Sequence, residues 1–355
     1  MDLSNLKNIL KGLLGVFYEP IRDYIFAPVW GAVTSVFHSG YTLFWLYLIT
    51  ALFIAFLSYA FNYAKGEKLS LAGFFKFCAP KEIFLHRSSI VDYKFYFANA
   101  FALKLVYGSS ILGAVVSAQF FSGRFRDFLE WLFGGTGPEW ELTVFSRAIY
   151  TVLTLLAFDF GIFLGHLLEH KVPFLWEFHK THHSAEVLNP ITNYRNHPLD
   201  KLLENFFVAV FTGALAGVFG YLYSGWVTEY TVLSVSSLFF FYLLVANLRH
   251  SHIWISYGWS LSHIFSSPAM HQIHHSAAEK HFDKNYAFIF SFWDYLAGSL
   301  YVPREREKLS WGLYNEDRRK YDSVWKLYLM PFIEVSSGLW RRKEIARRLA
   351  GGRVK

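Results

Sequence analysis

The sequence contains little cysteine and little charge. Its 355 residues include a single cysteine, Cys78, which excludes a disulfide within the chain and any metal site built from several thiolates. Charged residues make up 17% of the chain, whereas a soluble domain has roughly 25%. The chain therefore lacks enough ionic side chains to cover a water-facing surface, and lipid is the expected solvent for much of it.

Apolar residues are abundant instead. They account for 54% of the sequence, and they gather in runs of the length that a helix needs to cross hydrocarbon about 30 Å thick. These runs predict an all-α integral membrane protein with about four to five transmembrane helices. The runs comprise residues 41–64, 95–121, 148–165, 205–226 and 231–248.

The lysines and arginines between the runs predict the orientation in the membrane. Residues 65–92 and 166–204 are rich in bases, as is the C-terminal tail, so all three are expected in the cytoplasm. Residues 122–147 mix bases with acids and residues 227–230 contain no base, so both are expected as loops outside. Because the link at 227–230 is short, the last two runs form a hairpin that returns the chain to the cytoplasmic face.

Two flanking segments differ from this central part. Residues 1–39 begin with leucines at helical spacing and are expected to form an amphipathic, interfacial segment. Residues 304–355 contain 14 Lys and Arg against 7 Asp and Glu. This basic tail is expected to lie against anionic lipid headgroups, although a merely solvated tail is the alternative. Residues 40–303 then form the membrane-embedded domain.

Histidines cluster in three short motifs. His166 and His170 are four residues apart at the end of the third run, and the sequence HKTHHS (179–184) is echoed by HQIHHS (271–276). Spacings of three and four residues place side chains on one face of a helix. One tetrahedral metal site takes at most four protein ligands, so these eight histidines predict two metal ions in a cytoplasmic helical cap.

The motif histidines were weighed against their ordinary structural uses. A single histidine at a helix end is more often a cap than a ligand, so His38 and His86 are left out. Imidazole binds Zn, Cu, Fe and Ni alike, so the residues alone leave the metal open.

The motifs resemble those of the fatty acid hydroxylase and sterol desaturase superfamily of integral-membrane di-iron oxygenases. The likeness extends from about Lys81 to Pro303 and includes FHKTHHSAEVLNPITNYRNHPLD around the second motif. It implies two iron ions (Fe2+/Fe3+) with O2 as co-substrate, and it adds a ninth ligand from NLRHSHI. The implied metal ligands are His166, His170, His179, His182, His183, His250, His271, His274 and His275.

Catalytic residues beyond these ligands stay unknown, but three candidates could orient them. Asp159 lies seven residues before His166, and an acid in a membrane span is functional by default, although a hydrogen bond between helices is the alternative. Asn247 precedes His250 by three residues. The resemblance also makes His197 a site residue, against a hydrogen bond that fixes the Asn-His-Pro turn. Arg195 could hold a lipid phosphate or a neighbouring carboxylate.

The chain departs from the superfamily pattern in places that concern substrate. Relatives often have QHSN at residues 249–252, NYG at 285–287 and WDxxFGT at 293–299, where this chain has RHSH, NYA and WDYLAGS. These differences leave the substrate open without affecting the metal site. His252, His263 and His281 are not included among the ligands.

The expected reaction is hydroxylation of an unactivated C–H bond of a lipid, such as a fatty acyl chain or a sterol. Desaturation by the same site is the alternative. A zinc-dependent hydrolase is less favoured because the motif HExxH is absent, and a metal transporter because the motif histidines lie at one membrane face.

The chain has no flavin, haem or iron–sulfur signature, so its electrons must come from a ferredoxin- or cytochrome-type carrier with its reductase. No nucleic acid partner is expected. The resemblance favours a bacterial inner membrane, with the endoplasmic reticulum as the alternative, while the lipid, its reacting carbon and the oligomeric state stay open.

Overall fold

A computed structural model describes residues 19, 22–37, 43–63, 69–107, 113, 117–224, 227–229 and 247–351, with residues 62, 63, 107 and 339–351 described by their backbone alone. Within these ranges the secondary structure is helical, with three isolated β-bridges and no strand. The prediction of an all-α chain is therefore confirmed for this part of the sequence.

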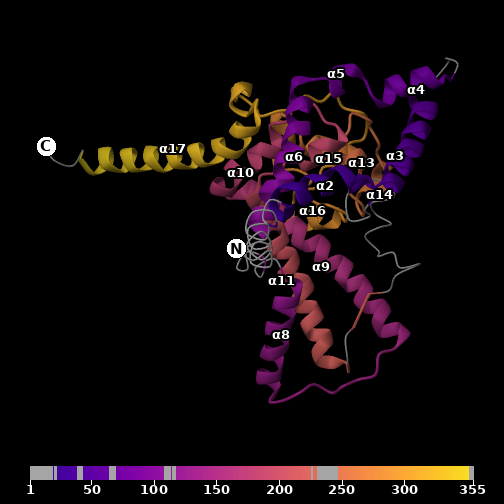
Figure 1. Ribbon diagram of the computed structural model, residues 1–355, viewed down its shortest axis with the longest axis vertical. Helices are drawn as coiled ribbons and strands as arrows, with labels where there is room; N and C mark the ends of the chain where they lie inside the picture. Colours follow the sequence, from indigo (N-terminus) through magenta and orange to yellow (C-terminus); the bar gives the residue numbers. More distant parts are fainter. Residues whose placement is uncertain are drawn as a thin grey trace, which may run out of the picture.

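Three helices form a stalk below the rest of the molecule (Figure 1). They are α8 (Ala118–Phe133), α9 (Val144–Lys171) and α11 (Pro198–Leu222). Both α9 and α11 are long and apolar enough to cross a membrane, and they contain most of the expected spans 148–165 and 205–226. Two of the expected spans thus correspond to helices that are candidates to cross a membrane.

Glycines bring the stalk helices into close contact. A β-carbon on Gly161 of α9 would lie 2.7 Å from the Cα of Val208 on α11. A β-carbon on Gly213 of α11 would lie 2.6 Å from the Cβ of Phe121 on α8. Small residues at such positions let helix backbones approach closely in a membrane. This packing fixes α9, and with it the two histidines near its C-terminal end.

The other expected spans fare differently. The first corresponds to α3 (Trp45–Ser58) and the following π-helix η3 (Tyr59–Tyr63). Its described apolar part, Trp45–Phe61, is shorter than a full span. The second divides, since α6 (Arg87–Tyr107) begins earlier than expected and α8 begins anew after the N-cap residue Ser117. The fifth, 231–248, lies outside the described residues except for its last two.

The expected loop at 122–147 is wrong over its first half, which belongs to α8. The charges that predicted a loop instead pair along the helix, with 3.2 Å between Arg124 and Asp127 and 2.9 Å between Arg126 and Glu130. Opposite charges three and four residues apart are neighbours on a helix surface and stabilise it.

Short helices gather at the upper end of the stalk and form the cap (Figure 1). Those near the C-terminal end of α9 are α10 (Pro173–His183), η4 (Pro190–Tyr194), α13 (Asn247–Arg249), α14 (Gly258–Ser262), α15 (Pro268–His274), η6 (Glu279–His281) and α16 (Phe292–Ala297). The remaining short elements are η1 (Arg22–Phe26), α2 (Ala27–Thr34), η2 (Ser35–Phe37), α4 (Leu71–Cys78), α5 (Lys81–Phe84) and η7 (Arg318–Tyr321).

The C-terminal helix α17 (Val324–Gly351) begins at the cap and extends sideways, away from it (Figure 1). Its first turns are anchored, because Leu327 and the nearby Tyr321 are buried against Val91 and Phe95 of α6. The first part of the segment expected as a tail therefore packs on the cap, and only the later turns of α17 leave it.

A buried ion pair joins the elements beneath this helix. The Arg195 guanidinium lies 2.7 Å from Asp92 of α6, and it donates hydrogen bonds to the carbonyl oxygens of Thr181 in α10 and Tyr321 in η7. Both charged side chains are at most 1% exposed. Arg195 was expected to hold either a lipid phosphate or a neighbouring carboxylate, and the structure shows it paired with a carboxylate.

Candidate metal centre

The nine histidines expected as ligands lie together in the cap, in two groups. Within each group, one nitrogen from every ring lies within 4.8 Å of the others. The first group consists of His166, His170, His179, His183 and His274, and the second of His182, His250, His271 and His275. Metal binding by these rings stays a prediction. The distances between their nitrogens show whether a metal ion would fit.

Each HX2HH motif divides its rings between the two groups. On α10 the outer pair, His179 and His183, belongs to the first group, while His182 belongs to the second. On α15 the division is reversed, since only His274 belongs to the first group. Each of the two HX2HH helices, α10 and α15, therefore contributes rings to both groups.

The second group is compact enough to surround one ion. The Nε2 atom of His250 lies 3.2 Å from that of His182, 3.1 Å from that of His275 and 2.9 Å from that of His271. Nitrogens at the corners of a tetrahedron with such edges lie roughly 1.9 Å from its centre, close to the ~2.0 Å of metal–imidazole bonds. One ring proton cannot satisfy three converging nitrogens, whereas one cation can.

The first group contains buried nitrogens that lack a hydrogen-bond partner. The Nε2 atoms of His170, His179, His183 and His274 are in this position among the described residues. Buried polar atoms are nearly always paired, and an exception calls for an explanation such as an ion. The residues present therefore fit a metal ion in the first group as well as in the second.

Burial also keeps these rings in the form that binds metal. It lowers the pKa of His179 to about 3, and it lowers the pKa of His182 and His275 well below the ordinary value. At neutral pH such rings are uncharged, and a neutral imidazole has a lone pair for a metal ion.

Backbone carbonyls orient two rings of the first group. The Nδ1 atom of His166 lies 2.8 Å from the carbonyl oxygen of Tyr286, and that of His274 lies 2.8 Å from the carbonyl oxygen of Lys284. A ring that donates from Nδ1 keeps its lone pair on Nε2. Both rings thus present Nε2 to the group.

Asp159 holds the segment that supplies one of these carbonyls. Its carboxylate accepts hydrogen bonds from the backbone of Ile289 and Phe290, at 2.7 and 2.9 Å, and from the Trp293 indole at 3.0 Å. Asp159 is fully buried. Asp159 therefore positions His166 indirectly, by holding the segment whose Tyr286 carbonyl contacts the ring.

The other two candidates lie beside the groups. His197 belongs to neither group, and its Nδ1 accepts from the backbone of Leu199 at the start of α11. This is the turn-fixing hydrogen bond that was its alternative. Asn247 is buried in α13, three residues before His250.

The three histidines left out of the ligand set have partners elsewhere. The ring of His252 contacts the carbonyl oxygen of Phe77, that of His263 contacts the carbonyl oxygen of Trp259, and His281 pairs with Glu307. None of the three belongs to either histidine group.

Two buried carboxylates beside the first group were missed in the sequence. Glu169 lies 3.1 Å and Asp200 3.8 Å from Nδ1 of His179, and all three side chains are 1–2% exposed. A carboxylate on the far nitrogen of a ligand histidine fixes its orientation. Glu169 stands inside the motif HLLEH, so an acid between two expected ligands was the available signal.

Arg249 is a further residue that the sequence reasoning did not assign. Its guanidinium lies 3.0 Å from Nδ1 of His271 and donates to the carbonyl oxygen of Ala287 at 3.0 Å. It stands where relatives often have glutamine, directly before His250.

The histidine groups lie between two pockets that share no lining residue among those described. A pocket of about 380 Å³ is lined by four of the nine rings together with residues such as Trp176, Lys180 and Tyr314. A pocket of about 320 Å³ faces the stalk and is lined by the other five rings. We call these the cap pocket and the stalk pocket.

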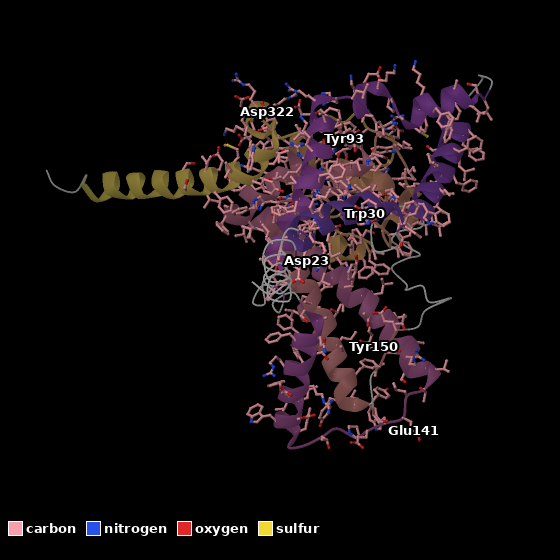
Figure 2. All side chains as sticks on the ribbon, in the orientation of Figure 1. Asp23, Trp30, Tyr93, Glu141, Tyr150 and Asp322 are labelled. Atoms are coloured by element: carbon pink, nitrogen blue, oxygen red, sulfur yellow. The ribbon has the colours of Figure 1, made fainter. Side chains whose placement is uncertain are left out.

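A larger cavity of about 880 Å³ adjoins the stalk pocket, since Phe158 and Val208 line both. It runs between the stalk helices past Tyr150, toward the end of the stalk marked by Glu141 (Figure 2). The nine rings therefore line two pockets, and the larger cavity lies next to one of them.

Comparisons with known proteins agree on one family. Residues 151–299, which include all nine histidines, match the family described as "Fatty acid hydroxylase". The chain is 30% identical to alkylglycerol monooxygenase of Xenopus tropicalis over 45% of this chain and 32% of that protein. It is 30% identical to ornithine lipid hydroxylase OlsE of Rhizobium tropici over 44% and 43%.

A third relative is cholesterol 25-hydroxylase of Rattus norvegicus, 28% identical over 46% of this chain and 50% of that protein. The chain thus spans about a third to a half of the length of these curated relatives. No solved structure matches it significantly.

Proposed function

We propose that this chain, whose residues 151–299 match the fatty acid hydroxylase family, is a membrane oxygenase that holds two iron ions and hydroxylates an unactivated C–H bond of a lipid. It would use O2 and electrons from outside. The named relatives act, by their names, on alkylglycerols, ornithine lipids and cholesterol, which supports a lipid substrate for this chain.

The observation that carries this proposal is the convergence of nine histidines, eight of them buried, in two groups of five and four. The five would hold one iron ion and the four the other. Bound iron supplies the activation of O2 and the cleavage of the C–H bond, while the protein binds and orients the reactants.

The surrounding residues keep this centre ordered and dry. The carbonyl oxygens of Tyr286 and Lys284 hold two rings in place, and Glu169 lies against a third. The motif rings of α10 and α15 are buried, and exclusion of water prevents side reactions of reactive species.

The position of the centre supports access from a membrane. His166 and His170 lie near the end of α9, one of the two helices able to cross a bilayer. The bases at 65–92 and 166–204 favour the cytoplasmic face for this end, and a bacterial inner membrane is the proposed location.

We place the electron carrier at the cap pocket, which shares no lining residue with the stalk pocket among the described residues. The indole of Trp176, which lines the cap pocket, has its ring centre 5.0 Å from that of His170 and 5.5 Å from that of His183. A small ferredoxin- or cytochrome-type protein could therefore bring its redox group close to the first histidine group. The later turns of α17, which carry Arg341, Arg342 and Lys343, would lie along anionic lipid headgroups.

Metal analysis and lipid analysis together test the proposal. Purified full-length protein should hold two iron ions per chain. Cells expressing it under 18O2 should contain a lipid that has gained one labelled oxygen, which cells expressing His275→Ala lack. His263→Ala is the matched control, because His263 lies in an exposed turn outside both groups.

Two other outcomes are informative. A lipid that loses two hydrogens and gains no oxygen would replace hydroxylation with desaturation. Protein that binds fewer than two metal ions, or that forms no oxygen-dependent product, would overturn the proposal.

A further inference from the structure

We propose that the lipid reacts on a carbon close to its polar end, and that the first turns of α11 hold this polar end beside the histidine groups. The inference rests on the function proposed above and deepens it by naming the substrate class. The depth of the centre, the polarity of the stalk pocket and the course of the larger cavity each support it.

The depth of the centre follows from its place on α9. The helix has 28 residues, from Val144 to Lys171, and His166 lies about 12 Å from its middle at roughly 1.5 Å per residue. The hydrocarbon of one leaflet is about 15 Å thick. With the middle of α9 at the middle of the bilayer, the centre lies near the boundary of hydrocarbon and headgroups, where a lipid standing in the leaflet presents its first chain carbons.

The stalk pocket has a polar wall at this level. The wall comes from the loop before α11 and from the first turns of that helix, which supply Asn193, Asn196, Lys201, Glu204 and Asn205. Lys201 and Glu204 form an ion pair. Asn196 likewise donates a hydrogen bond to the carbonyl oxygen of Asn193, so the wall is a polar surface held by contacts within the protein. A headgroup can add hydrogen bonds to such a surface, whereas a hydrocarbon chain can add none.

The lining becomes apolar with distance from the centre. Lys201, Glu204 and Val208 follow one another at helical spacing on the pocket side of α11, with Thr212 and Ala216 beyond them in the larger cavity. On α9 the pocket is lined by Ile162 and Phe158. A lipid with its polar group at Lys201 would thus have its chain directed down the stalk.

The larger cavity gives that chain a place. It begins at Phe158 and Val208 and continues between α8, α9 and α11 past Leu155. Its far end again has charged side chains, Arg126, Glu139 and Glu229, so a lipid held the other way round would react at its distal end. The depth of the centre favours the first arrangement, and the position of the new oxygen separates the two.

The polar wall also indicates the chemistry of the headgroup. It combines an ammonium, a carboxylate and three amides, which offer both donors and acceptors. A headgroup with both kinds of group, such as a zwitterion or one with amide and hydroxyl groups, matches this wall better than a single hydroxyl does.

The first experiment locates the oxygen. The total polar lipid extract of cells expressing the full chain under 18O2 is fragmented by mass spectrometry. We expect the labelled oxygen in fragments that keep the headgroup and the first few chain carbons. Label in the distal half of the chain would overturn this inference while leaving the proposed hydroxylation intact, and absence of any labelled lipid would overturn both.

The second experiment tests the polar wall. Lys201→Met in the full-length protein, assayed in vesicles of the same polar lipid extract, should lower kcat/KM roughly tenfold or more, because a charged hydrogen bond to the headgroup is lost. Its iron content should stay at two ions per chain, which shows that the centre has formed. Lys76→Met, an exposed lysine on α4, is the matched control.

The two results together decide the role of Lys201. An unchanged kcat/KM in Lys201→Met with full iron content would contradict a headgroup contact. If Lys201→Met loses its iron, Asn205→Leu takes its place. For Asn205→Leu we expect the same loss of kcat/KM, with the label still near the headgroup. If Asn205→Leu also leaves kcat/KM unchanged, the polar wall does not bind the headgroup.

Discussion

At the scale of single residues, the histidine rings of the two groups are buried and uncharged at neutral pH. The packed cap removes water from rings such as His179, and the neutral form is then favoured over the charged form. This preference favours metal binding at neutral pH, and it lowers the stability of the folded protein in acid.

Acid should destabilise the metal-free protein. The pKa of His179 is about 3 in the folded chain because of burial, against roughly 6.5 in an unfolded chain. Between these values the unfolded state binds a proton that the folded state does not, so stability falls as pH falls from 6.5 toward 3. Thermal unfolding of metal-free protein in detergent should give a lower Tm at pH 5 than at pH 7.5, and an equal Tm would contradict this account of the rings.

Glu169 should strengthen metal binding through His179. Its carboxylate lies 3.1 Å from Nδ1 of that ring, and loss of such a partner typically weakens metal affinity 10- to 100-fold. Glu169→Gln should therefore release iron to a chelator at lower chelator concentration than the parent protein. Glu305→Gln, in an exposed segment, should behave like the parent, and equal retention by both variants would count against this role.

At the scale of elements, the stalk depends on glycine contacts that differ along one helix. On α11 a β-carbon at Gly213 would lie 2.6 Å from both the carbonyl oxygen of Ala118 and the Cβ of Phe121, whereas one at Gly220 meets nothing within 4 Å. Gly213→Ala should lower the Tm in detergent by several degrees. Gly220→Ala should leave it unchanged or raise it, because alanine is favoured over glycine inside a helix by about 0.5–1 kcal/mol. Equal effects would show that α8 and α11 are not held by this contact.

The sequence could predict those features of the elements that depend on local spacing. The intervals in HKTHHS and HQIHHS are helical, and the structure has helices there, α10 and α15. Long apolar runs likewise predicted α9 and α11. Both signals need only neighbours along the chain.

Features that depend on distant partners could not be read in this way. His182 belongs to a different group from His179 and His183. This division depends on how α10 packs against the residues around His250, which are distant in the sequence. The use of Asp159 depends on residues 130 positions further on. The continuation of α8 beyond residue 121 was missed because its charges pair with one another along the helix, while composition alone treats a charged stretch between apolar runs as a loop.

At the scale of the whole molecule, Arg195 ties α6, α10 and η7 together through its ion pair with Asp92 and its hydrogen bonds to Thr181 and Tyr321. Removing one partner leaves the other charge buried and alone, which typically costs about 3–5 kcal/mol. Arg195→Met or Asp92→Asn should therefore lower stability far more than Arg319→Met, whose side chain is 81% exposed. Thermal unfolding of the three variants checks this, and the double variant should lose less than the sum of the two single variants.

The separation of the cap pocket from the stalk pocket also bears on the order of events in a catalytic cycle. With the lipid on one side and the electron carrier on the other, neither has to leave before the other arrives. Initial-rate plots against lipid at several carrier concentrations should then intersect rather than run parallel, and excess carrier should not compete with lipid. A molecule with one shared opening would have to admit its two large reactants by turns.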